Sequence, residues 1–407
     1  MVAGAGTMLA AVAHEPGGPD VLRLERRAIP QPASGEVLVR VMAFGISRWD
    51  IMARRGLVHD IRFPRVLGLD LAGVVAAAPA GEFRKGEAVA SAMGGLGRGF
   101  DGSYAEYACV PATQLVPIPA DLPWPVLGAA PETLHTAWGA LSRSLQVERG
   151  DRLLIRGGAT PVGLAALGIA TRRGAIVCAT IPSCADAALL RRRGARHVIV
   201  DNGAIARHVV AVFPRGMDKV LELVGPATLA DSLRCARKRG IVCLAGMLGS
   251  RTEFADFDPA AVIPTAVNLT TFDAPSEDFV LTPLDDLLGT VAAGTLHIQA
   301  DQVFPLERIV EAHAAMEASH GLAKIVVMPG SPATDTINAV EGERDNAGAP
   351  QDDEGRGDRR VRRPEAITPH DTPVPRPRGG GLLVKLALPA WAGGTPDHFV
   401  EGSPAPG

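Results

Sequence analysis

The sequence predicts an α/β protein with two domains, one mostly β and one built on a doubly wound parallel sheet. Three observations predict this class. Residues 152–245 alternate short apolar runs with helical stretches, a glycine-bearing turn lies inside the first of these repeats, and the chain before residue 123 holds short strand-like runs separated by Gly and Pro. With 407 residues and a formal net charge of −3, the chain is long enough for two domains and an extension. The near-neutral charge gives no reason to expect nucleic acid or an anionic membrane as a partner.

The first part of the chain is predicted to be mostly β. Its strand-like runs are rich in Val, Leu and Ala and are short, as strands of a small sheet are. Gly102–Val110 alternates as a half-buried strand does, and both Tyr104 and Tyr107 are expected on one side of it. The remaining strands are expected at Glu36–Phe44, Leu71–Ala76 and Glu87–Ala92.

Residues 151–183 predict a strand, a turn, a helix and a second strand. Arg152–Ile155 is apolar enough for a buried strand, Gly157–Gly163 turns the chain, and Leu164–Thr171 is expected to be helical. The N-terminus of such a helix favours the pyrophosphate of a dinucleotide, because free N–H groups and the positive end of the dipole lie there. Thr160 stands in the place of the middle glycine of G-x-G-x-x-G, so an ordinary strand-turn-helix is the alternative for this unit taken alone.

Further repeats favour the dinucleotide interpretation. Gly225 and Gly246 each follow an expected strand and so are predicted at the carboxyl edge of the sheet, where ligands bind. The expected strands are Ala175–Ala179, His197–Val200, Lys219–Val224 and Ile241–Ala245, and the expected helices are Ala185–Arg193, Ala204–Phe213 and Ala227–Lys238. The predicted cofactor-binding residues of this domain are Gly157, Gly158, Ala159, Thr160, Pro161, Val162, Gly163, Thr180, Ser183, Gly225, Gly246 and Met247.

Helices are expected again at Pro283–Ala293 and Leu306–Ser319, and a last strand at Lys324–Met328. We therefore expect the first domain to be completed by residues that follow the second. Residues 330–407 are rich in Gly, Pro and charged residues, which predicts a disordered tail.

Several motifs resemble, in order, the signatures of the medium-chain dehydrogenase/reductase superfamily. They are Gly45–Asp50, Pro64–Asp70, Gly102–Tyr107, Pro131–Trp138 and Gly321–Val327. The resemblance extends from about Met8 to Pro329 and is nearest to the zinc-free quinone oxidoreductases. It implies a GroES-like catalytic domain at 8–122 and 264–329, a Rossmann domain at 123–263, an N-terminal extension at 1–7, and an active site in the cleft between the domains.

The resemblance allows a zinc site to be tested on the residues. Zinc-dependent members of the superfamily bind the metal through a Cys, a His and a second Cys or its equivalent, and this chain has Ser47, Leu69 and Glu132 at those places. Leucine cannot donate to a metal, and one serine with one glutamate falls short of three ligands. The five cysteines, Cys109, Cys178, Cys184, Cys235 and Cys243, lack the close spacing of a structural zinc lobe. We therefore expect no metal site.

Without a Lewis acid, oxidation of simple alcohols loses its main assistance, which favours reduction of quinones or α,β-unsaturated carbonyls. The resemblance implies that Ser47 lies near nicotinamide and substrate, Arg48 near the pyrophosphate and Thr136 beside the nicotinamide. Asp50 either touches substrate or caps the helical turn Ile51–Arg55. Tyr104 is a third candidate catalytic residue, with structural packing as the alternative. His135 is either a proton donor or a packed side chain.

The predicted cofactor is NADPH, with NADH as an option. The second strand of the Rossmann unit ends in Thr180-Ile181-Pro182-Ser183, without the Asp or Glu that grips the ribose hydroxyls of NAD. Thr180 and Ser183 are expected to donate hydrogen bonds there instead. The expected partner is a small quinone or enone, with a homodimer left open. No apolar run approaches the roughly 20 residues of a spanning helix, so a cytoplasmic protein is expected. A zinc alcohol dehydrogenase and an NADPH-binding protein without turnover are the alternatives.

Overall fold

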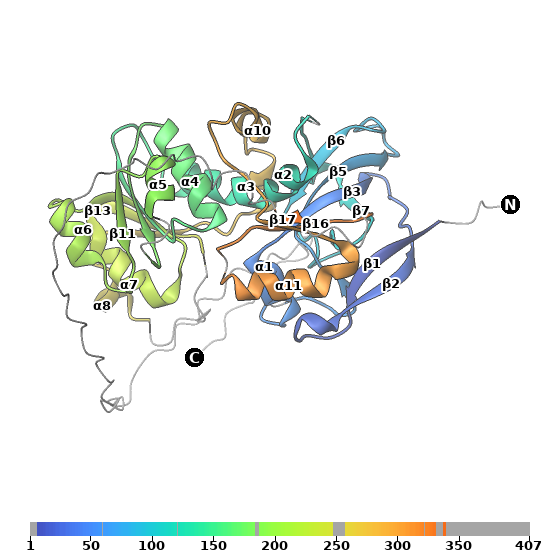
Figure 1. The fold of residues 1–407 in the computed structure, drawn as a ribbon, viewed down its shortest axis with the longest axis horizontal. Coiled ribbons are helices and arrows are strands. Elements are labelled where there is room, and N and C mark those ends of the chain that lie inside the picture. The colour runs from blue at the N-terminus through green and yellow to red at the C-terminus, as the bar shows by residue number, and fades with distance from the viewer. Residues whose placement is uncertain are drawn as a thin grey trace, which may run out of the picture.

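The computed structural model describes residues 6–58, 60–119, 121–183, 187–246, 257–320, 322–330 and 337–338. Within these ranges the chain forms two bodies, each built on its own main sheet (Figure 1). One body combines early elements, drawn in blue, with late elements, drawn in orange, and the other is drawn in green and yellow. The described part of the chain contains no helix long and apolar enough to cross a membrane.

The first body holds an eight-stranded sheet in the order β17-β15-β16-β3-β5-β6-β8, with β7 also paired to β3. Strand β16 (Ile325–Met328) pairs antiparallel with β3 (Glu36–Ile46), so that Val326 lies opposite Gly45. Late residues therefore pair into the main sheet of the first body. The other strands of the sheet are β5 (Asp70–Ala77), β6 (Ala88–Ala92), β7 (Tyr107–Pro111), β8 (Val116–Pro117), β15 (Gln302–Pro305) and β17 (Ile337–Asn338).

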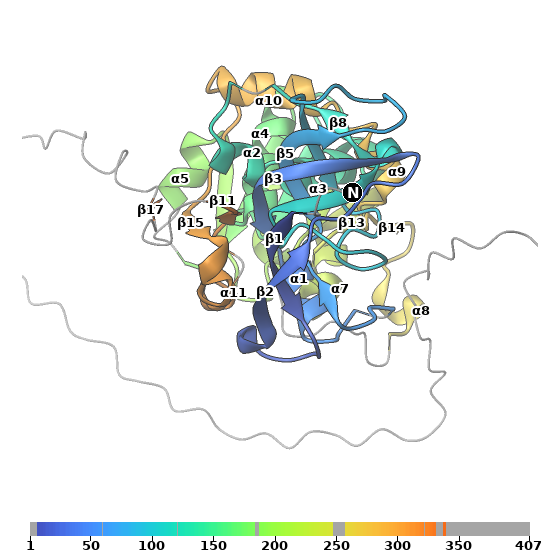
Figure 2. The same ribbon diagram turned by 90° about the vertical axis from the view of Figure 1, so that its right-hand side faces the viewer.

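A smaller three-stranded sheet packs in the same body. Its strands are β1 (Thr7–Ala13), β2 (Leu22–Ala28) and β4 (Arg65–Val66), and both β2 and β4 pair antiparallel with β1. Figure 2 shows this body from its outer side, with β1, β2 and helix α11 (Ile309–Ala318) toward the viewer.

The second body is a six-stranded parallel sheet in the order β11-β10-β9-β12-β13-β14. This order is that of a doubly wound dinucleotide-binding fold, as predicted. The strands are β9 (Arg152–Arg156), β10 (Ile176–Ile181), β11 (His197–Val200), β12 (Met217–Glu222), β13 (Ala236–Leu244) and β14 (Asn268–Thr271). The helices between them are α4 (Pro161–Arg172), α5 (Ala187–Arg192), α6 (Ala206–Val212), α7 (Pro226–Cys235) and α8 (Pro259–Val262).

Alternate residues of the central strands enter different hydrophobic cores. In β9, Leu153 and Ile155 join the core that includes α4, while Leu154 joins the core that includes α6 and α7. Because both faces are buried, the strands read as continuous apolar runs in the sequence. The remaining helices are α1 (Arg48–Arg54), α2 (Trp124–Ala129), α3 (Pro131–Gly139), α9 (Ser276–Phe279) and α10 (Leu284–Ala292).

The structure corrects three predictions. The helix expected over Ala227–Lys238 ends at Cys235, because Ala236 already pairs with Met217 of β12. The strand expected at Gly102–Val110 exists only as β7, because residues 102–106 turn closely around Gly68: a Cβ on Gly102 would lie 2.3 Å from the Gly68 oxygen. Tyr104 and Tyr107 therefore do not share a strand face.

The third correction concerns the second half of the chain. Strand β14 pairs with β13 in the six-stranded sheet, so the return to the first body falls after Thr271 rather than at residue 264. In the predicted tail, β17 pairs antiparallel with β15 and extends the first sheet. The rest of that tail and residues 1–5 lie outside the described residues.

Candidate active site

A cavity of about 170 Å³ lies between the two bodies, at the carboxyl edge of the six-stranded sheet. The first body contributes the junction of β3 and α1, Met316 of α11 and the residues before β16. Helix α3, which packs against α4 of the second body, contributes Glu132 and Thr136. The second body contributes the start of α4 and the residues that follow β12, β13 and β14. Most of these lining residues are apolar, so a bound molecule would be shielded from water there.

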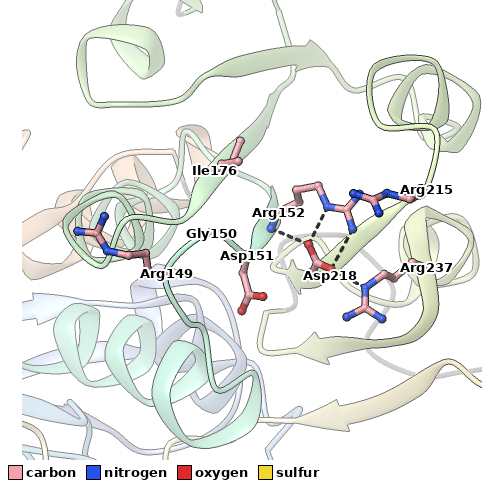
Figure 3. Close-up of a pocket in the computed structure, with 8 residues that line it drawn as sticks. All are labelled: Arg149, Gly150, Asp151, Arg152, Ile176, Arg215, Asp218 and Arg237. Atoms are coloured by element: carbon pink, nitrogen blue, oxygen red, sulfur yellow. Dashed lines mark hydrogen bonds and ion pairs between the residues drawn. The ribbon is translucent and has the colours of Figure 1, made fainter.

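A wider hollow of about 640 Å³ opens at the opposite edge of the same sheet, where β9, β10 and β12 begin. Figure 3 shows it lined by Arg149, Arg152, Arg215 and Arg237, with Asp218 among them. Asp218 holds the Arg152 guanidinium at 2.7 Å and also pairs with Arg237. Ligands of open α/β sheets bind at the carboxyl edge instead, so the smaller cavity is the candidate active site.

Ser47 lies in the cavity wall and caps helix α1. The Asp50 N–H donates to Ser47 Oγ at 3.3 Å, while Ser47 Oγ and N–H donate to Asp50 Oδ2 at 2.9 and 2.8 Å. Asp50 is 2% exposed and is not part of the cavity wall. Burial raises the pKa of Asp50 to about 6. From the sequence, Asp50 is expected either to touch substrate or to cap a helical turn. In the structure it takes part in capping α1, which begins at Arg48.

A buried ion pair forms another part of the wall. Lys324 Nζ donates to Glu132 Oε2 at 3.2 Å, and the two side chains are only 5% and 13% exposed. Thr136, one turn along α3, donates to Glu132 Oε1 at 3.5 Å. Asp70 lies behind this pair: its Oδ1 accepts from Gly45 N–H at 2.9 Å, and its Oδ2 accepts from Glu132 N–H at 3.4 Å. Burial raises the pKa of Asp70 to about 7.

Sequence reasoning missed Lys324 and Asp70 as site residues. A signal was present, since each is a single charged residue next to an apolar strand run, Leu-Asp-Leu-Ala-Gly for Asp70 and Ala-Lys-Ile-Val-Val for Lys324. A charge placed in this way is rarely buried without a partner. The partner, Glu132, was interpreted only as a failed metal ligand.

The three positions that correspond to zinc ligands do not form a metal-binding set. Ser47 donates its hydroxyl hydrogen to Asp50, Glu132 pairs with Lys324, and Leu69 has no donor atom. Among the residues that the structure describes, no group of three or more His, Cys, Asp or Glu side chains is placed to hold a metal. The residues present do not fit a catalytic zinc ion.

The glycine turn between β9 and α4 is built for close packing. Gly157 has φ +87°, a Cβ on Gly158 would lie 2.8 Å from the Ala179 Cβ, and a Cβ on Gly163 would lie 2.4 Å from the Gly157 oxygen. Thr160 is the N-cap of α4: its Oγ1 accepts from Gly163 N–H at 3.0 Å and donates to the Gly157 oxygen at 2.8 Å. Pro161 has no N–H, so Val162 carries the remaining donor among the first three helical residues.

The other predicted residues of the Rossmann unit lie at the same edge in varied settings. Thr180 is 1% exposed and its Oγ1 accepts from Gly157 N–H at 3.0 Å, so its hydroxyl supports the turn. Ser183 follows β10 and is exposed. Gly225 N–H donates to Glu222 Oε1 at 2.9 Å at the start of α7. Met247 lies outside the described residues.

Only part of the predicted site comes together in the cavity. Its wall contains Ser47, Arg48, Thr136, Thr160, Pro161, Val162 and Gly246. The wall does not contain Asp50, Tyr104, Gly157, Gly158, Ala159, Gly163, Thr180, Ser183 or Gly225.

Tyr104 and His135 are packed side chains in the structure. Tyr104 is fully buried, stacks on Phe44, and its hydroxyl lies 2.9 Å from His313 Nε2. Burial raises the pKa of Tyr104 well above its usual value. His135 is also fully buried, with Nδ1 2.9 Å from Thr282 Oγ1, and burial lowers its pKa. Neither residue reaches the cavity wall, so the packing alternative holds for Tyr104 and His135.

Comparison with known proteins gives a consistent assignment. Residues 33–120 match the family described as alcohol dehydrogenase GroES-like domain, and residues 193–327 match the family described as zinc-binding dehydrogenase. A 2-haloacrylate reductase of a Burkholderia species is 29% identical over 348 residues, which are 79% of this chain and 99% of that protein. The chain belongs to the medium-chain dehydrogenase/reductase superfamily.

Further relatives place this dehydrogenase/reductase in the quinone oxidoreductase-like branch. A Homo sapiens quinone oxidoreductase is 28% identical over 319 residues, 77% of this chain and 95% of that protein. The solved structure of mycobacterial Rv1454c complexed with NADPH has 28% identity and a TM-score of 0.70, over 79% of this chain and 100% of that chain. The protein is therefore an oxidoreductase that uses a nicotinamide cofactor and a small-molecule substrate.

Proposed function

We propose that this protein is a zinc-independent reductase that uses NADPH to reduce quinones or α,β-unsaturated carbonyls. The observation that carries the proposal is the bonding of two side chains in the cavity wall. Ser47 donates a hydrogen bond to Asp50 and Glu132 forms an ion pair with Lys324, so neither belongs to a set of metal ligands. Without a metal to polarise an alcohol, alcohol oxidation lacks its usual assistance. A conjugated acceptor is already electrophilic and needs mainly alignment and exclusion of water. Relatives named quinone oxidoreductase and 2-haloacrylate reductase support this substrate class.

The residues at the carboxyl edge fit a dinucleotide. The Gly157–Gly163 turn brings the chain close to β10, Val162 offers its N–H, and Arg48 adds a positive charge from the other side of the cavity. Thr136 lies beside the Glu132–Lys324 pair, where the nicotinamide ring would enter. When bound in its reduced form, the nicotinamide supplies a hydride. Ser47 and Thr136 orient the reacting groups, and the apolar wall keeps water away.

NADPH is proposed over NADH because β10 ends without an acidic residue. An Asp or Glu at that place would repel the 2′-phosphate and bind the ribose hydroxyls of NADH. The relative complexed with NADPH is in line with this choice. Ser183, which follows β10 and is exposed, is a candidate for contact with the phosphate.

The test follows the absorbance of NADPH and NADH with quinones, enones and simple aldehydes, with and without a chelator. We expect oxidation of NADPH with the conjugated acceptors, slower oxidation of NADH, and no effect of the chelator. Stoichiometric zinc in the purified protein, with activity lost on chelation and restored by metal, would refute zinc independence. Tight NADPH binding without oxidation by any acceptor would instead support a binding protein without turnover.

A further inference from the structure

The Lys324 ammonium packs closely against the backbone of Gly45, beside the cavity. Gly45, at the end of β3, has no side chain, and a Cβ there would lie 2.7 Å from Lys324 Nζ and 2.8 Å from its Cε. Strand β16 begins at the next residue and is fixed to β3, so the backbone that carries Lys324 is rigid. The Lys324 N–H is also held, by Asp301 Oδ2 at 2.6 Å. Lys324 and its partner Glu132 both line the cavity.

Acidic residues surround this ammonium from three elements. Glu132 of α3 binds it directly, while Asp70 of β5 and Asp50 of α1 interact with it electrostatically. Burial lowers the pKa of Lys324, but Glu132 and Asp70 outweigh this effect and raise it overall, so the lysine is protonated. Three ionised carboxylates around one ammonium would leave a buried net negative charge, which is costly. In agreement with this cost, the pKa values of both Asp50 and Asp70 are raised.

The Lys324–Glu132 pair is better explained by a functional role than by a contribution to stability alone. Burying a Lys–Glu pair usually gains little over apolar residues of similar size. Here the pair lies in the wall of the cavity beside Ser47 and Thr136. Arg48, the other cation in that wall, is more exposed than Lys324. Lys324 is the buried cation that a reacting carbonyl oxygen would meet.

We propose that Lys324 is a catalytic residue, whose ammonium hydrogen-bonds the acceptor's carbonyl oxygen and protonates it as the carbon is reduced. This role rests on the proposed function. The β-carbon of the conjugated acceptor takes a hydride from the reduced nicotinamide, which is thereby oxidised. A C–H bond forms, the C=C π electrons form the enolate double bond, and the carbonyl π electrons move to oxygen. The Nζ–H bond then breaks as the O–H bond forms. A quinone becomes the keto tautomer of its hydroquinone, which enolises in water, and an enone becomes an enol, which tautomerises to the saturated ketone. A proton from solvent then restores the ammonium.

A phenol tests the oxyanion site without any turnover. The phenolate of 4-nitrophenol resembles the developing enolate, and it absorbs visible light whereas the neutral phenol does not. The wild-type protein should bind 4-nitrophenol as the phenolate at a pH below the pKa of the free phenol. Lys324→Met should bind it in the neutral form. Binding of the neutral phenol by the wild-type protein, or equal ionisation in Lys324→Met, would overturn the proposal.

Steady-state rates add a second measurement. Lys324→Met should lower kcat about 10²–10⁴-fold, the range for loss of a general acid, while NADPH affinity measured by fluorescence is unchanged. Because Lys324→Met leaves Glu132 unpaired, the double variant Lys324→Met/Glu132→Gln guards against misfolding and should show the same loss. Lys238→Met, an exposed lysine of β13, is the matched control and should behave as wild type. A folded double variant with wild-type kcat would contradict the role of Lys324. A wild-type protein that oxidises no NADPH would instead contradict the proposed function, and the phenol experiment separates the two failures.

Discussion

Arg156 should carry a large share of the stability of the second body, and Arg156→Met tests this. The guanidinium is fully buried at the end of β9 and forms two bonds of 2.8 Å with Asp201 and one of 2.9 Å with Asp231. It also donates to the Ser232 hydroxyl at 3.1 Å. The methionine retains much of the apolar volume but leaves two carboxylates unpaired beside buried Glu222. Removing one partner of a buried ion pair costs about 3–5 kcal/mol, so we expect a loss of that size in the free energy of unfolding.

Urea denaturation followed by circular dichroism measures this change, with the slope checked against wild type to exclude an altered denatured state. Arg308→Met is the matched control, because Arg308 pairs with Glu311 on the exposed surface of the first body. Pairs of that kind contribute little, so the control should unfold like wild type. A loss below about 1 kcal/mol for Arg156→Met would show that the two aspartates find other partners, and the reasoning from burial would fail.

Three other changes test the site. Gly163→Ala should destabilise the protein by about 1–3 kcal/mol, because the new Cβ would lie against backbone atoms. The control Gly289→Ala in α10, where nothing lies within 4 Å of the new Cβ, should stabilise the protein by about 0.5–1 kcal/mol. Equal stability of the two variants in urea would contradict the close approach at Gly163. Ser47→Ala should lower the free energy of unfolding by about 0.5–2 kcal/mol through the lost helix cap. It should also lower turnover while NADPH affinity stays unchanged, and Ser47→Thr should restore the cap. A wild-type rate in Ser47→Ala would exclude an orienting role for the hydroxyl. Asp70 has a raised pKa in the folded state, so the folded protein binds the proton more tightly, and this contribution to stability is lost as pH rises from about 4 to about 7. Asp70→Asn should remove that slope, and a pH profile of unfolding free energy parallel to wild type would refute the assignment.

Much of the fold could be predicted from the sequence because its signals are local. The strands of the second body are apolar on both faces, and glycine marks the turn after β9, so type and order follow from pattern alone. The boundary between α7 and β13 depends instead on pairing of Ala236 with Met217, residues far apart in the chain. The turn at residues 102–106 likewise depends on its contact with Gly68. Such tertiary contacts override local preference and leave no periodic trace.

The site divides in the same way. Ser47, Arg48 and Thr136 lie in motifs that retain their spacing, and the structure brings all three to the cavity. The group of Asp70, Glu132 and Lys324 joins three elements separated by long stretches of chain. No sequence window contains two of these residues, so their mutual pairing could be found only from the fold.

The residues at the start of α4 limit how this helix can bind an anion. Thr160 caps α4 with its own hydroxyl and, together with Pro161, reduces the N–H groups that the helix can offer to a pyrophosphate. A negative ligand must then depend more on cations from the other body. Arg48 and Lys324 both line the cavity from that side, and Lys324 is the more deeply buried of the two. Cofactor and acceptor would thus each meet a cation of the first body and a glycine-rich edge of the second.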